Sequence, residues 1–361
     1  MKKFKIFIIP FLMLGSAPFV LPPFAASAGS LDFSSKVCAP YVECWNNLSV
    51  SSLSTNTGNK YYTLAFIISN STANSAPYWD GTMPLSENRY VSDIANLRAA
   101  GGDVIISFGG AGGSELAQVY TSASALQAAY QQVVTKYSLK WMDLDIEGAF
   151  VADAVHINLR NQALKNLQAA NPGLKVSYTL PVMPEGLDQY CLDLLSNAKT
   201  NGVQLHVVNV MTMDYGSCNM DMGQAAINAA SSTRTQLATL GISAKIGITP
   251  MIGVNDVSCE NFTTANAQTV LNYANANSYI GFIGFWAMDA DANHAYINIF
   301  KNFSAPLAVM PVMTAQAPLA AGGHKLGTYD IMGRLVAPSN NRVSIEKLIT
   351  INGNEYVLKI K

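Results

Sequence analysis

Charged side chains are scarce in this chain, and the scarcity excludes several kinds of partner. Only 12% of the 361 residues are Asp, Glu, Lys or Arg, whereas about 25% is usual for soluble domains. The formal net charge is −1, so the chain lacks the basic surplus that attracts nucleic acid or an anionic membrane. We therefore expect neither nucleic acid nor a membrane surface as a partner of the mature protein.

The chain also lacks the motifs that bind metals, cofactors or phosphate. Its four histidines occur in no metal-ligand spacing, and no Ser-His-Asp set is readable. The glycine-rich stretch Gly109–Gly113 has no lysine of a phosphate-binding loop, and its spacing does not match a dinucleotide fingerprint. We therefore predict neither a metal site nor a cofactor.

Cysteine is infrequent, with five residues in the chain. Cys38 and Cys44 flank an expected strand, and extended chain separates them by roughly 20 Å, too far for a mutual disulfide. Cys218 and Cys259 each follow a later strand, in neighbouring loops of the expected fold. The predicted pairing is Cys218–Cys259, and the alternative is that all five cysteines are buried as small apolar residues.

The only long apolar run lies at the N-terminus. Lys2, Lys3 and Lys5 precede an apolar stretch over residues 6–24 that several prolines interrupt, and Ala26–Ala28 supplies a small-x-small cleavage site. This pattern predicts a signal peptide over residues 1–28 and a secreted protein. A retained membrane anchor is the alternative, which the prolines disfavour. No later stretch reaches the length of a membrane-spanning helix.

Apolar runs of strand length recur through residues 29–303, with helix-like segments between them. Parallel strands that are buried on both faces have this nearly continuous apolar character. Eight βα units in about 265 residues predict a single (β/α)8 TIM barrel; an open doubly wound sheet, the alternative, rarely needs eight. The runs are Ala39–Cys44, Tyr62–Ser69, Asp103–Gly109, Trp141–Glu147, Lys175–Pro181, His206–Tyr215, Lys245–Ile252 and Tyr279–Met288.

The composition changes after residue 303. Residues 304–323 are rich in Ala, Pro and Met, which predicts a linker. Residues 324–361 contain short strand-like runs and are expected to form a β-rich tail. The segment Tyr329–Val336 has the form Tyr-Asp-x-x-Gly-Arg-x-Val and resembles C-terminal secretion-sorting tails. The resemblance implies that the tail directs secretion or attachment to the cell surface.

Three carboxylates stand at alternate positions in one expected strand. Asp143, Asp145 and Glu147 are separated by single apolar residues, Leu144 and Ile146. Because successive side chains of a strand alternate between its faces, the three acids point the same way. Neighbouring negative charges raise a carboxyl pKa, and a raised pKa suits a general acid near neutral pH. Glu147 is the last of the three, at the strand end where TIM barrels place catalysis.

Asp-x-Asp-x-Glu on a strand resembles the central signature of glycoside hydrolase family 18, the chitinases. A second family signature, Ser-x-Gly-Gly, is matched at Ser107–Gly110, and Trp286 stands where the family has a tryptophan beneath the sugar. Family members often have a further aspartate three residues before Asp143, where this chain has Lys140. The resemblance covers residues 38–303.

A tyrosine hydroxyl is a further expected part of the site. The family has a Met-x-Tyr-Asp strand, whereas this chain reads Met213-Asp214-Tyr215, so the register is open. Tyr215 is favoured as the hydroxyl donor because Met213 and Tyr215 have the period of a strand. With that register, Asp214 is the less favoured candidate for the neighbouring acid of the family strand.

The resemblance implies a secreted, retaining chitinase that uses the acetamide of its own substrate as nucleophile, with chitin or chito-oligosaccharides as partners. Glu147 is the implied acid, Asp145 holds the acetamide, Asp143 tunes Asp145, and Tyr215 steadies the acetamide. We expect a monomer. The substrate-binding residues expected are Trp286, Met213, Asp214, Tyr41, Phe66, Gly109, Gly110 and Trp79.

Two alternative functions remain open. One is an endo-β-N-acetylglucosaminidase that acts on N-glycans or peptidoglycan by the same mechanism. The other is a chitin-binding protein without turnover, which the presence of both Asp145 and Glu147 disfavours.

Overall fold

The computed structural model describes residues 32–303 and four short segments of the tail, residues 328–329, 335–336, 345–351 and 354–360. The predicted signal peptide over residues 1–28 and the predicted linker over residues 304–323 lie outside the described residues. The chain separates into two compact units, residues 1–308 and 309–361, and each is considered by itself.

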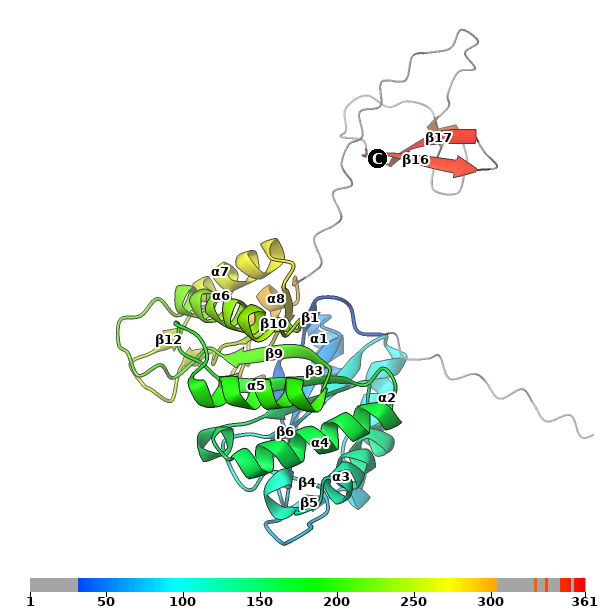
Figure 1. Cartoon of the computed structure of the whole chain (residues 1–361). Coiled ribbons are helices and arrows are strands. Elements are labelled where there is room, and N and C mark those ends of the chain that lie inside the picture. The colour runs from blue at the N-terminus through cyan, green and yellow to red at the C-terminus, as the bar shows by residue number, and fades with distance from the viewer. Residues whose placement is uncertain (1–31, 304–327, 330–334, 337–344, 352–353, 361) are drawn as a thin grey trace, which may run out of the picture. The chain divides into compact units, whose positions relative to one another are not determined.

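Eight parallel strand positions close into a barrel, as the sequence predicts (Figure 1). The first position is shared by two short strands, because β1 pairs with the last barrel strand and β2 pairs with β3. That divided strand closes the ring. The strands are β1 (Val37–Cys38), β2 (Tyr41–Glu43), β3 (Tyr61–Ile68), β6 (Asp103–Gly109), β7 (Trp141–Asp145), β8 (Lys175–Pro181), β9 (Leu205–Met211), β10 (Lys245–Thr249) and β13 (Ile280–Ile283).

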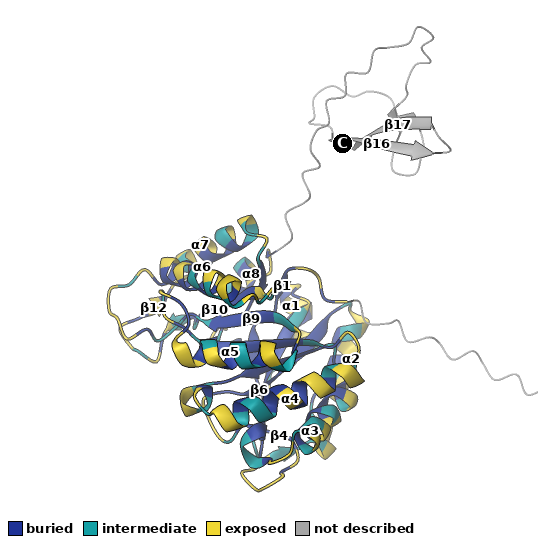
Figure 2. Cartoon of the chain, viewed as in Figure 1, coloured by how far each residue is buried: buried dark blue, intermediate teal, exposed yellow. Residues whose placement is uncertain are grey.

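Helices follow the barrel strands and cover the outside of the ring. Figure 2 shows their buried faces turned toward the sheet and their exposed faces turned outward. Their starts are capped locally: the side chains of Asp153, Asp188 and Asp221 each accept a backbone N–H of the first turn, and Thr263 forms a capping box with Asn266. The helices are α1 (Val50–Thr57), α2 (Val91–Ala99), α3 (Ala123–Tyr137), α4 (Ala154–Ala170), α5 (Gln189–Asn201), α6 (Met222–Leu240), α7 (Thr264–Ala276) and α8 (Ala295–Phe300).

The interior of the barrel is apolar toward the amino ends of the strands and polar above that level. Trp141, the first residue of β7, packs with Phe33, Ile105, Val207 and Phe282 in one buried cluster. Since side chains of one face recur every second residue, the next inward positions of β7 are 143 and 145. The even-numbered residues of β7 instead pack under the helices, in the main core. The alternation of side chains along β7 therefore points Asp143 and Asp145 into the barrel.

Short hairpins extend the barrel loops. β4 (Tyr78–Trp79) and β5 (Met83–Pro84) add an antiparallel hairpin beside β3, and the loop after β10 contains β11 (Gly253–Val254) and β12 (Asn261–Phe262). Three short 3-10 helices, η1 (Leu85–Glu87), η2 (Leu116–Val119) and η3 (Gly148–Val151), complete the loops. Within the described part of the chain, no helix has both the length and the apolar character needed to cross a membrane.

The described segments of the tail are strands, as the sequence predicts. β14 (Thr328–Tyr329) pairs with β15 (Leu335–Val336), and β16 (Ile345–Ile351) pairs with β17 (Asn354–Ile360), both antiparallel. The last pairing extends from Ile345 opposite Ile360 to Ile351 opposite Asn354, which is a two-stranded hairpin.

Candidate active site

Asp143 is buried in the barrel, and hydroxyl groups from the two neighbouring strands surround it. The register places Ser107 of β6 and Ser177 of β8 directly beside it. Ser107 donates to Oδ2 at 2.8 Å, Ser177 donates to Oδ1 at 2.5 Å, and the Thr179 hydroxyl lies within 3.0 Å of both oxygens. Burial raises the pKa of Asp143, while these hydrogen bonds stabilise its charged form and lower the pKa.

Asp145 lies two residues closer to the carboxyl end of β7, and its hydrogen-bond partners differ from those of Asp143. Its side chain is buried, with 4% of its surface exposed, yet Oδ1 has no hydrogen-bond partner among the described residues. Burial, followed by the negative charges of Glu147 and Asp143, holds the pKa of Asp145 well above its ordinary value. A buried oxygen without a partner is costly unless a ligand supplies one, so Asp145 is prepared to receive a hydrogen bond.

Glu147 lies just beyond the end of β7, where η3 begins, and its side chain is half-buried. Burial raises the pKa of Glu147, the charge of Asp214 raises it further, and a hydrogen bond with Asp145 opposes the rise. A carboxyl group that keeps its proton to higher pH can act as a general acid.

The glycine-rich loop after β6 allows the backbone to approach Asp145 closely. Gly109 has φ +98°, and a Cβ there would lie 2.1 Å from the Asp145 carbonyl oxygen. Gly110 has φ +89°, and a Cβ there would lie 2.6 Å from the Phe66 ring. The backbone N–H of Gly110 donates to the same Asp145 carbonyl at 3.0 Å. These glycines are required by both backbone conformation and space.

A cavity of about 770 Å³ opens above these acids at the carboxyl ends of the strands. It is within the size range of sites that bind small molecules. Six of the eight expected substrate-binding residues line it; Gly110, which packs behind Phe66, and Trp79 do not. Asp143, an expected catalytic residue, lies deeper. The lining residues named in the sequence analysis are Tyr41, Phe66, Gly109, Asp145, Glu147, Met213, Asp214 and Trp286.

Aromatic rings form one side of the cavity. The Trp286 ring stacks on Phe66 at 5.6 Å between centroids, and it contacts Tyr41 at 5.8 Å. Trp45, in the loop after β2, lies 6.3 Å from Trp286 and has 47% of its surface exposed. An exposed indole beside a partly exposed one offers the flat apolar surface on which a sugar ring packs.

The expectation that Tyr215 supplies a hydroxyl group to the cavity is wrong. β9 ends at Met211, before the expected strand end, and Asp214 has a left-handed backbone with φ +52°, so the period of two does not continue to Tyr215. Tyr215 is buried in the main core instead, whereas Asp214, an expected substrate-binding residue, lines the cavity.

Asp214 is held between two loops that are joined covalently. Its Oδ1 accepts the backbone N–H of Val257 at 2.8 Å. The buried Glu260 accepts the backbone N–H groups of Tyr215 and Ser217 at 3.1 and 3.0 Å. The predicted Cys218–Cys259 disulfide is present and links the same two loops. Cys38, Cys44 and Cys191 are buried free thiols.

We expect the Cys218→Ser/Cys259→Ser double variant to lose about 2–4 kcal/mol of unfolding free energy, because the bond closes a loop with a sequence separation of 41. Urea unfolding followed by tryptophan fluorescence measures the loss. Dithiothreitol is the control: it should destabilise the wild-type protein to a similar extent and leave the double variant unchanged. Equal urea midpoints for oxidised wild type and variant would contradict the prediction.

The expectation that Trp79 extends a sugar subsite is also wrong. Trp79 lies on β4 and is fully buried. Its indole N–H donates to the Tyr137 hydroxyl on α3 at 2.8 Å, and its ring packs edge-on against Tyr90 and Tyr137. The β4–β5 hairpin folds this side chain onto the helices, away from the cavity.

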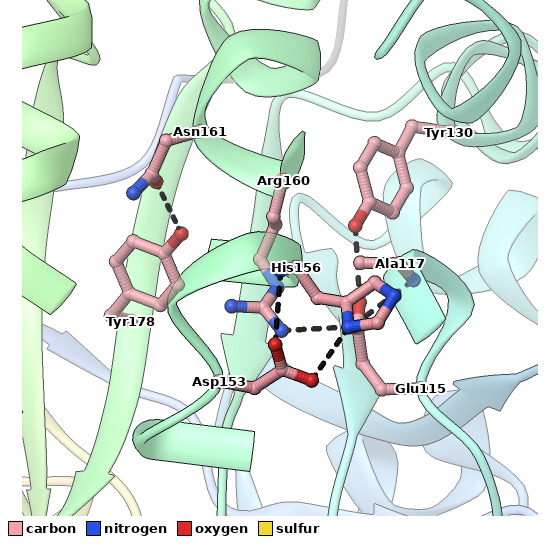
Figure 3. A network of polar contacts seen from close by, with 8 residues as sticks. All are labelled: Glu115, Ala117, Tyr130, Asp153, His156, Arg160, Asn161 and Tyr178. Atoms are coloured by element: carbon pink, nitrogen blue, oxygen red, sulfur yellow. Dashed lines mark hydrogen bonds and ion pairs between the residues drawn. The ribbon is translucent and has the colours of Figure 1, made fainter. Parts of the chain in front are cut away.

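A buried ion pair, drawn with its polar partners in Figure 3, lies next to the glycine-rich loop. Glu115, at the start of η2, accepts from Arg160 of α4 at 2.9 Å and from the Tyr130 hydroxyl at 3.1 Å. The two charged side chains have 2% and 0% of their surface exposed. The Glu115 Cγ lies 3.6 Å from where a Cβ on Gly109 would be. The pair therefore ties the loop beside Asp145 to α4, the helix that follows β7.

Several residues of the site escaped the sequence analysis. Ser177 and Thr179, which hold Asp143, have a detectable signal: they are the polar residues at alternate positions of Lys175–Pro181. Trp45 and the cavity acids Asp188 and Asp256 lie in loops, where no periodicity marks them. Among the residues that the structure describes, no group of three or more His, Cys, Asp or Glu is placed to hold a metal ion.

Two curated proteins are similar to this chain. The Escherichia coli protein named "Probable bifunctional chitinase/lysozyme" is 36% identical over 277 residues, 71% of this chain and 31% of that protein. "Endochitinase 11" of Metarhizium anisopliae is 36% identical over 280 residues, 71% of this chain and 52% of that protein. The chain thus spans about a third and about a half of the lengths of these relatives. No protein-family model matches the chain.

Solved structures are similar as well. The catalytic domain of the hyperthermophilic chitinase from Pyrococcus furiosus is 32% identical with a TM-score of 0.65, and the match covers 72% of this chain and 86% of that domain. A family GH18 chitinase catalytic domain from a fern, 17% identical with a TM-score of 0.54, shares the fold; the match covers 74% of this chain and 97% of that domain. With its Asp-x-Asp-x-Glu strand inside a closed barrel, this chain belongs to the glycoside hydrolase family 18 chitinases.

Proposed function

We propose that this protein hydrolyses β-1,4 bonds between N-acetylglucosamine units of chitin by a retaining, substrate-assisted mechanism. The observation that carries the proposal is the pair formed by Asp145 and Glu147 in a cavity with an aromatic wall. Asp145 presents a buried oxygen without a partner, and Glu147 has a raised pKa. The names of the similar proteins, an endochitinase and a chitinase/lysozyme, agree with this chemistry.

Each acid has a separate role in the proposed reaction. Glu147 protonates the glycosidic oxygen of the leaving sugar as the bond breaks. The acetamide oxygen of the substrate attacks the anomeric carbon and forms an oxazolinium ion, so the configuration is retained after water opens it. Asp145 accepts the acetamide N–H, which directs the acetamide oxygen toward the anomeric carbon. Asp143, held by Ser107, Ser177 and Thr179, sets the charge and position of Asp145 from below.

The positions of the acids favour a nucleophile from the substrate. A retaining enzyme with its own nucleophile needs two carboxyl groups about 5 Å apart that flank the bond. Asp145 is the last residue of β7 and Glu147 follows two residues later, so we expect both carboxyl groups to approach a bound sugar from the same side. Asp214 lines the cavity from another loop, but its Oδ1 is bonded to the backbone N–H of Val257. Asp143 lies too deep to line the cavity.

The alkaline limb of the pH profile should shift to lower pH in the Asp214→Asn variant. The general acid works in its protonated form, so activity falls as pH rises through the pKa of Glu147. The negative charge of Asp214 raises this pKa, and its removal lowers the pH at which Glu147 loses its proton. Measurement of kcat/KM against pH with a fluorogenic chitobioside tests the shift. Asp188→Asn is the matched control, since Asp188 lines the same cavity but does not raise the pKa of Glu147. If the alkaline limb of the pH profile stays in place in Asp214→Asn, Glu147 is not the general acid whose pKa Asp214 raises.

Secretion is part of the proposal. The N-terminal pattern over residues 1–28 lies outside the described residues and remains a sequence prediction. The Cys218–Cys259 disulfide is an independent argument, because such bonds persist in oxidising compartments. Detection of the protein in the culture medium, with a mature N-terminus after Ala28, tests secretion.

Peptidoglycan is a second candidate substrate, because the name of the Escherichia coli relative includes lysozyme activity. A direct comparison decides between the polymers. The protein is incubated with soluble chitin and with purified peptidoglycan, and the released reducing ends are counted. Faster release from chitin supports the proposed function, whereas release from peptidoglycan alone overturns it.

A further inference from the structure

The lining of the active-site cavity is rich in acidic side chains. Six of its residues are acids, and none is Lys, Arg or His. The whole chain has 22 basic and 23 acidic residues, so the excess is local to the cavity and not a property of the protein. The lining acids are Asp80, Asp145, Glu147, Asp188, Asp214 and Asp256.

Three of these acids have no part in the proposed chemistry. Asp80, Asp188 and Asp256 are exposed, and they come from the loops after β3, β8 and β10. Because these strands lie at separate positions around the barrel, the three acids surround the mouth of the cavity instead of clustering at one point. The absence of a metal-holding group among the described residues agrees with this spacing.

The three carboxylates are free to meet a cation. The ion pairs among the described residues join Arg98 to Asp103, His156 to Asp153, Arg160 to Glu115 and Lys175 to Asp32, so none involves a cavity acid. Asp188 accepts one backbone N–H as the cap of α5, at 2.8 Å from Cys191. A concave site lined with one sign of charge raises the local concentration of ligands of the opposite sign.

We infer that the cavity selects partly deacetylated chitin, in which an N-acetylated unit at the cleaved bond is flanked by glucosamine units whose ammonium groups face Asp80, Asp188 and Asp256. This inference rests on the proposed chitinase function. The buried oxygen Oδ1 of Asp145 has no hydrogen-bond partner among the described residues, and in the proposed mechanism the amide N–H of the substrate supplies one. The exposed acids Asp80, Asp188 and Asp256 need no amide group and can pair with a protonated amine. A glucosamine unit supplies that amine on the same sugar ring, which can still pack on the Trp45 and Trp286 rings.

The test is a binding comparison with the full-length Glu147→Gln variant, in which turnover of the ligand is expected to be at least roughly 10²-fold slower. Its dissociation constants for fully acetylated and partly deacetylated hexamers are measured by calorimetry at mildly acidic pH. We expect the partly deacetylated hexamer to bind about tenfold more tightly at low salt. The advantage should disappear in about 1 M salt, where the Debye length falls to roughly 3 Å.

A triple substitution locates the effect. Asp80→Asn, Asp188→Asn and Asp256→Asn together remove the three charges and keep the side-chain shape. Asn tolerates the left-handed backbone of Asp80 at φ +51° and caps a helix as well as Asp does at position 188. We expect the triple variant to lose the preference for the partly deacetylated hexamer. Glu87→Gln, which removes an exposed acid outside the cavity, should keep the preference.

Each outcome decides the inference. Equal affinity for the two hexamers at low salt, or a preference that survives the triple substitution, overturns it. The proposed function is judged separately, by turnover in the wild-type protein. If the wild-type protein cleaves the fully acetylated hexamer but the binding preference is absent, only this inference fails. If it cleaves neither hexamer, the proposed function fails, and this inference fails with it.

Discussion

The Glu147→Gln variant should lose at least a factor of roughly 10² to 10⁴ in turnover while it still binds chito-oligomers. General acid catalysis typically contributes a factor of that size. Glutamine keeps the shape of the side chain and one acceptor oxygen, but its amide cannot release a proton to the leaving oxygen. The substitution leaves the cavity-lining side chains of Trp286, Phe66 and Asp145 in place, so affinity should be retained.

Two measurements check this prediction together. Single-turnover rates on a fluorogenic chitobioside give the loss in the chemical step, and calorimetry gives the affinity. Glu87→Gln is the matched control, because Glu87 lies on η1, is exposed and does not line the cavity. Turnover near the wild-type level in Glu147→Gln would remove Glu147 from its proposed role. Loss of binding together with turnover would indicate that the substitution damages the site and not the proton transfer alone.

The barrel was predictable from the sequence because one physical rule applies along most of it. Buried parallel strands leave nearly continuous apolar runs, and each of the eight runs corresponds to a barrel strand in the structure. The same rule placed Asp143 and Asp145 inside the ring, since inward positions recur every second residue within β7. Where a strand is regular, the sequence therefore predicts the direction of its side chains.

The rule failed where the strand ended. The expected strand over His206–Tyr215 stops at Met211, and the left-handed backbone at Asp214 rotates the following residue out of phase. The turn is stabilised by contacts from another loop: Val257 donates to Asp214, and Glu260 accepts from Tyr215. Such contacts connect residues more than 40 positions apart, so a local pattern contains no information about them.

The burial of single aromatic residues also could not be predicted from the local sequence pattern. Trp79 and Trp45 both stand in loops in the sequence, yet one is fully buried against Tyr137 and the other is 47% exposed beside Trp286. The difference comes from the β4–β5 hairpin, which carries Trp79 onto the helices. Whether a loop residue lies in the site or in the core depends on tertiary contacts, which cannot be inferred from the local sequence.

Cleavage should depend absolutely on the N-acetyl group of the sugar at the cleaved bond. We expect the wild-type protein to cleave N-acetylated chito-oligomers, and to release no product above background from cello-oligomers or fully deacetylated oligomers of equal length. The reason is that only an acetamide at C2 can supply the nucleophile that Asp145 and Glu147, on one strand end, do not provide. Chromatography of the products tests this, and a thiazoline analogue of the oxazolinium ion should inhibit the reaction.

One ligand should therefore bind to the cavity without being cleaved. A fully deacetylated hexamer carries the positive charge that Asp80, Asp188 and Asp256 attract, yet it lacks the acetamide that the buried Asp145 oxygen orients. It should compete with acetylated substrate at low salt and remain intact after long incubation. Cleavage of this hexamer, or a covalent sugar found on Asp145 or Asp214 by mass spectrometry, would refute the substrate-assisted mechanism. Either result would leave the glycosidase assignment standing, because Glu147 could still act as the proton donor for an enzyme-borne nucleophile.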